Sequence, residues 1–514
     1  MASEGAGAAR APERRLHPFS WLFVLLTQLR QVIVPLLVLL VLGRGEWWEL
    51  AAVVGAAGLA LYSLVYSFGF RYRLEADELV VREGIIDRTE RHIPYARVQN
   101  IVQKRNPLHR MFGVSELRLE SAGGLKPEAV MSVIPLADAL RIERILREHA
   151  APQVGGDDPV AVEPAAAASP ILLRLPLPEL LRLGLVTNRG WVVVGAGMAL
   201  LWQVVPEERG VARSAWRLVE PWIGIGAEYI PGPLAWAASA ALFLLMVLLA
   251  VKALSLLMAV VDFHGFVLER RGERVRTEAG LLTRRVASAR RDKVQRLLFA
   301  DGWLMRRMGR QALSCEVAGG LIAANEDAGA RLRWLAPIAP PAEIERIADD
   351  VAEGLLPSRM DWQPLHPQAW RRMFNAAAFW WTVVAVPPLV AFGPWVLAGW
   401  ALLLGWTFIE ARAAARFGAW AFDGEVFAVR GGWLTRRWTL ARIGRGQSVS
   451  LASTPLDRRA GMASVSMDTA GVRPGSFELR VDYLDADRAR ELHASLAARL
   501  DPVRATGWEP REAA

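Results

Sequence analysis

The sequence predicts a membrane protein in which α-helical transmembrane hairpins alternate with α+β, mainly β, modules. Three observations support this fold class: the composition, the apolar segments, and a polar segment that occurs three times. The chain has 514 residues, of which 53% are hydrophobic and 22% are charged. This composition is too apolar for an ordinary soluble enzyme and too charged for a protein made mostly of transmembrane helices. A membrane protein with large polar modules fits both values.

Apolar residues are concentrated in three pairs of segments that long polar stretches separate. The pairs cover about residues 21–42 and 47–68, 183–205 and 234–251, and 379–391 and 395–408. A helix needs roughly 20 apolar residues to cross about 30 Å of hydrocarbon, so the third pair is short for two spans. We expect transmembrane hairpins at residues 19–68, 178–262 and 373–411, and six spans in all.

Lys and Arg residues next to the spans predict the orientation of the chain. Arg10, Arg14 and Arg15 precede the first span, and basic residues also follow the second, fourth and sixth spans. Segments on the cytoplasmic side are enriched in Lys and Arg. We therefore expect a multi-pass membrane protein with both termini, the tail at residues 1–18 and all modules in the cytoplasm.

Arg30 is the ionisable residue that lies deepest in an expected span, between Gln28 and Gln31. Ionisable residues inside membranes commonly mark a polar path. Alternatively, the first helix begins at Gln31 and Arg30 lies at the interface. The first interpretation would suit a transporter of lipids or small molecules, which is the alternative to a binding protein.

The polar segments between the hairpins contain one pattern in three copies. When the copies are aligned on a shared glutamine, a glycine lies 15 residues before it and another lies 14 residues after it. Such ungapped spacing indicates an internal repeat, and glycine at these positions suits turns with positive φ. The repeat-defining residues are Gly84, Gln99 and Gly113; Gly280, Gln295 and Gly309; and Gly432, Gln447 and Gly461.

The copies define three modules of similar organisation. Each begins with alternating patterns typical of strands and ends with an amphipathic helical pattern. The modules cover residues 69–150, 263–355 and 412–502, and linkers at 151–177 and 356–372 and a tail at 503–514 complete the chain.

The order of hairpin and module, the glycine followed by two apolar residues, and the loop with leucine, arginine and glycine resemble a known family. They are similar to the bacterial pleckstrin-homology-like (PH-like) domain membrane proteins of the YdbS and YdbT type. The resemblance implies that the protein lies in the bacterial inner membrane and that each module is a PH-like, partly open barrel with a C-terminal helix. It also loosely implies a role in envelope stress or resistance to antimicrobial peptides.

Basic residues are concentrated in the repeated segment and form the candidate binding site. They are Arg88, Arg97, Lys104, Arg105 and Arg110; Arg284, Arg285, Arg290, Arg291, Lys293, Arg306 and Arg307; and Arg436, Arg437, Arg458 and Arg459. Basic residues beside an anionic leaflet gain about 1 kcal/mol each, which favours lipid headgroups as ligands. Docking between modules, control of membrane topology, and binding of a partner protein of the same family are the other uses that we consider.

The sequence predicts binding or scaffolding at the membrane rather than chemistry. The histidines show no metal-binding spacing, and no phosphate-binding loop or nucleophile motif is present. We therefore expect no enzyme activity, no metal and no cofactor. The basic stretches also lack a nucleic-acid-binding pattern, so no nucleic acid partner is expected.

Overall fold

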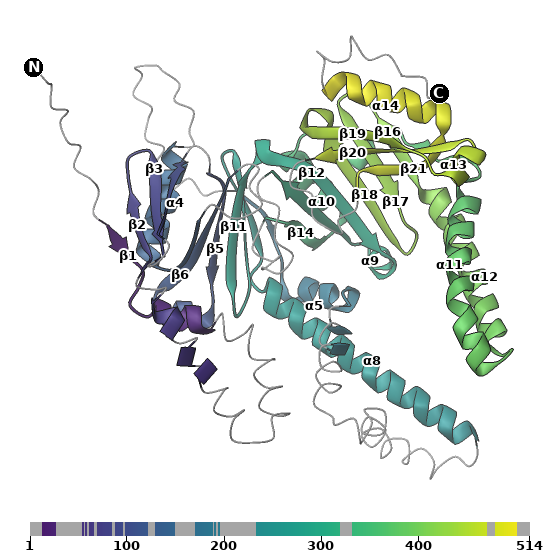
Figure 1. Ribbon diagram of the computed structural model, residues 1–514, viewed down its shortest axis with the longest axis horizontal. Helices are drawn as coiled ribbons and strands as arrows, with labels where there is room; N and C mark the ends of the chain where they lie inside the picture. The colour runs from purple at the N-terminus through teal and green to yellow at the C-terminus, as the bar shows by residue number, and fades with distance from the viewer. Residues whose placement is uncertain are drawn as a thin grey trace, which may run out of the picture.

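The computed structural model describes residues 13–26, 54–55, 57–58, 61–65, 69–84, 88–95, 98–121, 129–149, 170–188, 190–191, 194–195, 233–318, 332–469 and 478–500. In this part of the chain, three helices are long and apolar enough to cross a membrane (Figure 1). They are α8 (Pro233–Phe263), α11 (Ala369–Phe392) and α12 (Val396–Phe417). Arg30 and the centre of the first expected hairpin lie outside the described residues.

The third hairpin is present and its helices are longer than expected. We predicted a hairpin over residues 373–411, but α11 begins at Ala369 and α12 ends at Phe417. The two helices lie side by side, and the rings of Trp370 and Phe408 are 5.5 Å apart. Arginines near these ends allow each helix to extend beyond its apolar stretch toward the modules.

The two spans expected in the second hairpin differ from the prediction where the structure describes them. The expected fourth span ended at Val251, but α8 continues without a break to Phe263. Lys252 therefore lies inside the helix rather than after it, and its Nζ donates hydrogen bonds to the carbonyl oxygen of Leu185 (2.9 Å) and to Oδ1 of Asn188 (2.6 Å).

These acceptors lie at the end of α5 (Leu177–Val186), a short helix beside α8. The expected third span began at Leu183, but Leu183 is a buried residue of α5 and the helix ends three residues later. The two helices are so close that a Cβ at Gly184 would lie 2.6 Å from the Cα of Leu256. The start of the predicted span is therefore a packed helix that joins the second module to α8.

Each module contains two groups of three strands and a C-terminal helix, as the patterns predicted. Module 1 contains β2 (Arg71–Leu74), β3 (Glu78–Glu83), β4 (Thr89–Pro94), β5 (Val98–Arg105), β6 (Val114–Ser121), β7 (Ala129–Pro135) and α4 (Leu136–His149). Module 2 contains β9 (Val267–Arg271), β10 (Arg274–Ala279), β11 (Arg284–Arg290), β12 (Val294–Gly302), β13 (Gln311–Val317), β14 (Trp334–Ala339) and α10 (Pro341–Val351). Module 3 contains β16 (Ala419–Phe422), β17 (Val426–Gly431), β18 (Thr435–Arg442), β19 (Gly446–Ala452), β20 (Met462–Thr469), β21 (Arg480–Asp485) and α14 (Ala486–Leu500).

The C-terminal helices cover the apolar cores of the modules. Ile142 of α4, Ile344 of α10 and Leu496 of α14 are fully buried. The core of module 1 is separate, whereas the core of module 2 continues into module 3 and includes Ala428 and Leu440. Among the described buried residues, modules 2 and 3 therefore share one apolar core, whereas the core of module 1 is separate.

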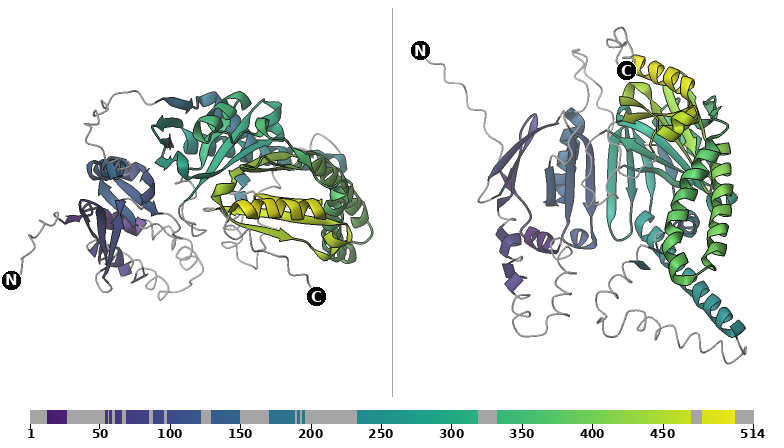
Figure 2. Two further views of the ribbon diagram at one scale, coloured as in Figure 1. Left: turned by 90° about the horizontal axis from the view of Figure 1, so that it is seen from above. Right: turned by 45° about the vertical axis from the view of Figure 1, so that its right-hand side comes forward.

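The strands of one module do not close into a barrel, so the expected partly open barrel is not confirmed. The described strands form four open sheets, with the orders β1-β2-β3-β4, β7-β6-β5-β11-β10-β9-β8, β14-β13-β12-β18-β17-β16-β15 and β19-β20-β21. Each seven-stranded sheet combines the second half of one module with the first half of the next (Figure 2). Strand pairing therefore makes the three modules one continuous array.

Each module also contains a strand that precedes its hairpin in the sequence. These strands are β1 (Arg14–Arg15), β8 (Ile171–Arg174) and β15 (Gln363–Pro364), and they pair with β2, β9 and β16. We had assigned these residues to the tail and the two linkers. A signal was present, because Leu16, Leu175 and Leu365 follow the three strands and each has a proline within two residues.

Candidate functional site

The three aligned glutamines lie at the same irregularity of the sheet. The pairing of β5 with β6 passes over Gln99, and the pairings of β12 with β13 and β19 with β20 pass over Gln295 and Gln447 in the same way. Each glutamine is thus the extra residue of a β-bulge, which bends and twists its strand. Gln295 Nε2 donates to the carbonyl oxygen of Lys293 (3.1 Å), so the shared role is one of the backbone.

The aligned glycines have the conformation that their spacing predicted. The first set, Gly84, Gly280 and Gly432, has φ values of 87°, 112° and 96°, and the second set, Gly113, Gly309 and Gly461, has values of 65°, 63° and 68°. The second set follows three short helices, which are α3 (Pro107–Met111), α9 (Trp303–Arg307) and α13 (Pro455–Arg459). Residues with a side chain rarely adopt positive φ, which explains why glycine occupies all six positions.

An arginine of the short helix crosses each junction between modules. Arg110 Nη1 donates to the carbonyl oxygen of Leu281 (3.4 Å), and Arg306 Nη2 donates to that of Trp433 (3.0 Å). The two arginines are equivalent in the repeat, and so are the two acceptors. Docking between modules, one of the uses that we considered for these residues, is therefore the use that the described contacts show.

The junction between modules 2 and 3 combines one acid among its basic residues with apolar packing. Asp301 lies opposite Arg436 in the strand pairing and accepts a hydrogen bond from Arg306 Nη1 at 2.7 Å. Burial raises the pKa of Asp301, and the contact with Arg306 acts in the opposite direction. Beside this group, Phe299 lies opposite Trp438.

The junction between modules 1 and 2 has a different charge. Arg105 occupies the place of Asp301 and lies opposite Arg284, while Lys104 lies opposite Arg285. Burial, followed by the charges of Arg110 and Arg284, lowers the pKa of Arg105. We call the following residues the basic cluster: Lys104, Arg105, Arg110, Arg284 and Arg285.

Polar atoms of the basic cluster are only partly satisfied within the described part of the chain. Arg284 pairs with Glu278, and Arg285 Nη1 lies 3.7 Å from Asp262 Oδ1. The Nε atoms of Arg105 and Arg285 are buried and make no hydrogen bond among the described residues. Because a buried polar atom without a partner is costly, an anionic ligand at this place would gain from both charge and hydrogen bonds.

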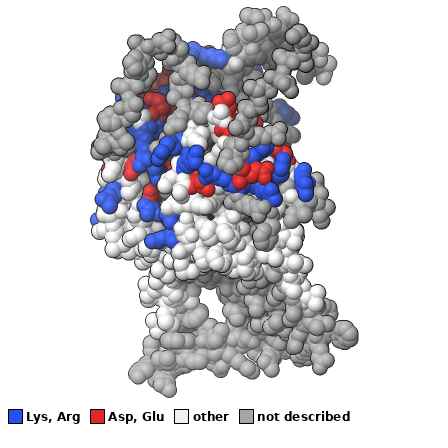
Figure 3. Space-filling model, turned by 90° about the vertical axis from the view of Figure 1, so that its left-hand side faces the viewer, with Lys and Arg blue, Asp and Glu red and all other residues white. Residues whose placement is uncertain are grey.

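The basic cluster lies at the ends of the membrane helices. The turn that follows Gly280 is attached to the end of α8, where the backbone amide of Leu281 donates to the carbonyl oxygen of Val261 (2.9 Å). Leu281, Leu282 and Met111 are exposed apolar side chains at the same level. In the side view of Figure 3, charged residues occupy the upper part of the described surface, and the described surface below them is mostly uncharged.

The other predicted basic residues do not join this cluster. Arg290, Arg291 and Lys293 precede β12 and thus lie at the opposite end of that strand from α9, on the order of 25 Å away. Arg290 Nε donates to Asp292 (3.0 Å), and Arg291 Nε donates to the carbonyl oxygen of Val351 (3.3 Å). The repeated segment is therefore divided between both ends of the sheet.

The remaining predicted residues have separate surroundings. Arg436 lies over the ring of Phe417, Arg437 lies opposite Ala300 in the strand pairing, and Arg458 donates to the carbonyl oxygen of Ser453. Arg88, Arg307 and Arg459 are exposed. Arg97 lies outside the described residues.

A buried ion pair stands beside the bulge of module 2. Arg296 Nε donates to Glu316 Oε2, and the two side chains are only 1% and 5% exposed. The equivalent residues face each other as Asn100 with Glu120 in module 1 and as Ser448 with Asp468 in module 3. The charge of Arg296 is thus particular to module 2.

These features define a membrane protein built from repeated PH modules. The family model described as "Bacterial PH domain" matches residues 22–150, 224–353 and 381–500, which is more than half of the chain, and the protein belongs to this family. The three matches confirm the predicted resemblance and the three copies.

Among curated proteins, the "UPF0699 transmembrane protein YdbT" of Bacillus subtilis (strain 168) is 25% identical over 139 residues. This match covers 25% of the present chain and 28% of YdbT, so the chain matches little more than a quarter of that relative. No solved structure matches the chain.

Proposed function

We propose that the protein is a multi-pass scaffold that anchors a continuous PH array at the cytoplasmic face of the inner membrane and binds anionic lipid headgroups at the basic cluster. The main observation behind this proposal is that Arg105 at the first junction holds the position that Asp301 holds at the second junction. Asp301 at this place offsets part of the positive charge of the second junction, whereas at the first junction both of the charged groups acting most on Arg105 are basic.

The surroundings of the basic cluster favour a lipid over a soluble anion. Leu281 and Leu282 are exposed beside the cluster, at the end of α8. Basic residues next to exposed apolar ones suit the boundary between headgroups and acyl chains. A phosphate group there could accept hydrogen bonds from several guanidinium groups at once.

The scaffold part of the proposal depends on the array and on its orientation. Arg371 and Arg372 lie at the start of α11, and Arg412 and Arg416 lie near the end of α12, all on the side of the modules. By the preference of Lys and Arg for the cytoplasmic side, this side is the cytoplasm and the full chain has six spans. A role in envelope stress would use the same scaffold and rests on the family resemblance.

A transport path gains little support from the described spans. The hydroxyl of Thr382 donates to the carbonyl oxygen of Ala378 in the same helix, and Lys252 is engaged by the end of α5. These polar groups are used locally, so we favour binding over transport.

The test compares Arg105→Asp with Arg459→Asp in the full chain. Arg105→Asp places at the first junction the residue type that the second junction already has, while Arg459→Asp makes the same charge change at an exposed residue of α13. Removing two units of charge corresponds to about 2 kcal/mol, or roughly 30-fold weaker binding. The measurement is native mass spectrometry of the purified protein with phosphatidylglycerol or phosphatidylcholine.

We expect Arg105→Asp to lose phosphatidylglycerol and Arg459→Asp to retain it, with little effect on phosphatidylcholine in either variant. Equal losses in both variants would show general attraction by net charge and would refute a site at the junction. Retention by Arg105→Asp, with an unchanged melting temperature, would refute lipid binding by the basic cluster.

A further inference from the structure

The two internal junctions are copies of one interface. Antiparallel pairing places Ser288 opposite Ile101 at the first junction and Leu440 opposite Leu297 at the second. Ser288 and Leu440 are equivalent in the repeat, and so are Ile101 and Leu297. Both junctions thus have the same strands and the same register, although their side chains differ in charge.

This repetition leaves one unused half of the interface at each end of the array. β4 is equivalent to β11 and β18, and among the described residues it pairs only with β3. β19 is equivalent to β5 and β12, and it pairs only with β20 in the same part of the chain.

The residues of β19 are exposed where their equivalents are covered by the next module. Gln103 of β5 is 9% exposed and Phe299 of β12 is 1% exposed, whereas Leu451 of β19 is 40% exposed. These three residues hold the same position in the repeat, so the difference reflects the missing neighbour.

β19 also lacks the features that normally protect an edge strand. Proteins prevent pairing at such edges with charged residues, prolines or bulges. Gly446–Ala452 contains no charged residue and no proline, and its bulge at Gln447 leaves the stretch from Val449 onward regular. An uncharged and regular edge of this kind favours a partner strand.

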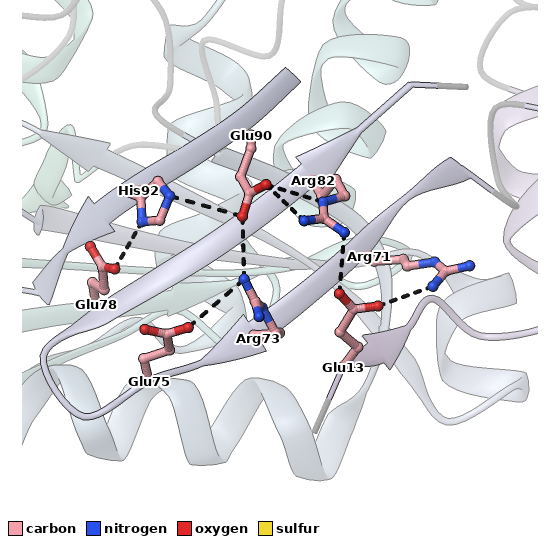
Figure 4. Close-up of polar contacts among 8 residues, drawn as sticks. All are labelled: Glu13, Arg71, Arg73, Glu75, Glu78, Arg82, Glu90 and His92. Atoms are coloured by element: carbon pink, nitrogen blue, oxygen red, sulfur yellow. Dashed lines mark hydrogen bonds and ion pairs between the residues drawn. The ribbon is translucent and has the colours of Figure 1, made fainter. Parts of the chain in front are cut away.

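Two charged side chains of β4, Glu90 and His92, are held by contacts within their own sheet. Glu90 accepts hydrogen bonds from Arg82 Nη2 (2.8 Å) and Arg73 Nη2 (3.2 Å), and His92 Nδ1 lies 2.8 Å from Glu78 Oε1. All five side chains are held on one face of their own sheet (Figure 4). The equivalent strands β11 and β18 also have arginines in their first residues, and they nevertheless pair with β5 and β12 of the preceding module.

The arginine that crosses each internal junction has an equivalent beside β19. Arg458 Nη1 donates to the carbonyl oxygen of Ser453 (3.3 Å), as Arg306 Nη1 donates to that of Asp301 (3.1 Å). Arg306 also reaches the next module, whereas among the described residues Arg458 contacts only its own module. The third copy therefore carries the same connecting residue at the open end.

We propose that β19 of one molecule pairs with β4 of a second copy of this chain, in the register of the internal junctions. Ser450 then lies opposite Arg91, and Ala452 lies opposite Thr89. The internal junctions leave α8, α11 and α12 on one side of the sheets, so the same contact between copies keeps both in one membrane (Figure 1). Such a head-to-tail contact extends the array from molecule to molecule.

Disulfide crosslinking of the full chain in native membranes tests this register. Two differently tagged forms are coexpressed, one with Ser450→Cys and the other with Arg91→Cys, and the membranes are treated with a mild oxidant. Directly opposed residues of antiparallel strands are close enough for a disulfide. Leu298→Cys with Thr439→Cys in one chain is the matched control, because these residues hold the equivalent positions at the second junction.

We expect a crosslinked dimer that contains both tags and is absent when either form is expressed alone. Ala452→Cys with Thr89→Cys is a second pair in the same register, for use if one of the first variants fails to accumulate. The proposal is overturned if neither pair crosslinks while the control pair does. It is also overturned if Ser450→Cys crosslinks to itself or to a different protein, since these results mean a two-fold interface or another partner.

Discussion

Two glycines of module 2 provide a direct test of how the repeat determines its backbone. Gly280 and Gly309 both have positive φ, of 112° and 63°. A Cβ added at Gly309 would meet no atom within 4 Å, whereas one added at Gly280 would lie 2.0 Å from the carbonyl oxygen of Thr283. Replacement by alanine therefore adds backbone strain at both positions and a steric clash at Gly280 alone.

The expected losses of stability follow from these distances. Left-handed backbone costs an ordinary residue about 1–2 kcal/mol, which is the whole effect expected for Gly309→Ala. In Gly280→Ala the new Cβ clashes with the backbone of Thr283, so the turn must move. This movement also strains the hydrogen bond that the amide of residue 280 donates to the carbonyl oxygen of His264. We expect a loss of roughly 3–5 kcal/mol, at the upper end for single substitutions.

Cys315 supplies the assay, because it is the single cysteine of the chain and is buried in module 2. A thiol-reactive fluorogenic dye labels it as this module unfolds on heating. For a domain of this size, 1 kcal/mol lowers the melting temperature by about 4–8 °C. Equal shifts for Gly280→Ala and Gly309→Ala would refute the steric argument, and no shift in either would refute the assigned backbone conformation.

Three further predictions concern two ion pairs and the contact between α5 and α8. Glu316→Gln removes the carboxylate that pairs with the buried charge of Arg296 and should lower the free energy of unfolding by about 3–5 kcal/mol. Replacing both residues, by Leu and Met, should lower it much less. Dye labelling of Cys315 on heating measures both variants. The hydrogen bond from Arg310 lowers the pKa of Glu179 below its ordinary value of 4.5. The stability from this contact is thus present above about pH 4.5 and is lost as the pH falls through the lower pKa of Glu179 in the folded state. Glu179→Gln should therefore reduce the pH dependence of the melting temperature in this range. An unchanged pH profile would contradict the assigned contact. Lys252→Met should loosen the contact between α5 and α8 and increase proteolysis near residue 188, and a cleavage rate equal to that of the unchanged protein would argue against this anchor.

The sequence predicted the repeat and its turns well, because glycine at positive φ leaves a signal that does not depend on distant residues. The spacing of Gly113 and Gly309 was enough to predict their conformation. The five residues of the basic cluster were also among the predicted site residues. The excess of positive charge at the first junction could have been predicted from the alignment of the repeats, because Arg105 occupies the position of Asp301 and reverses the charge there.

Within the basic stretch at residues 97–113, a strand is present that the sequence patterns do not predict. Residues 98–105 form β5, and the bulge at Gln99 conceals its alternation. Val98 and Ile101, three residues apart, are both buried, which is not the period of a regular strand. The pairing of β5 with β11 could not be predicted either, because an edge strand carries no mark of the distant strand that completes it.

The strands that precede the hairpins place a condition on how the chain crosses the membrane. β8 pairs with β9 and β15 pairs with β16, although at least one candidate membrane helix separates the two strands of each pair in the sequence. Paired strands must lie on the same side, so the chain between them must cross the membrane an even number of times. A segment that failed to insert, or that inserted alone, would leave one strand in the wrong compartment, and the module would lack the edge of its sheet. Completion of each sheet therefore acts as a check on how the chain between its first two strands crosses the membrane.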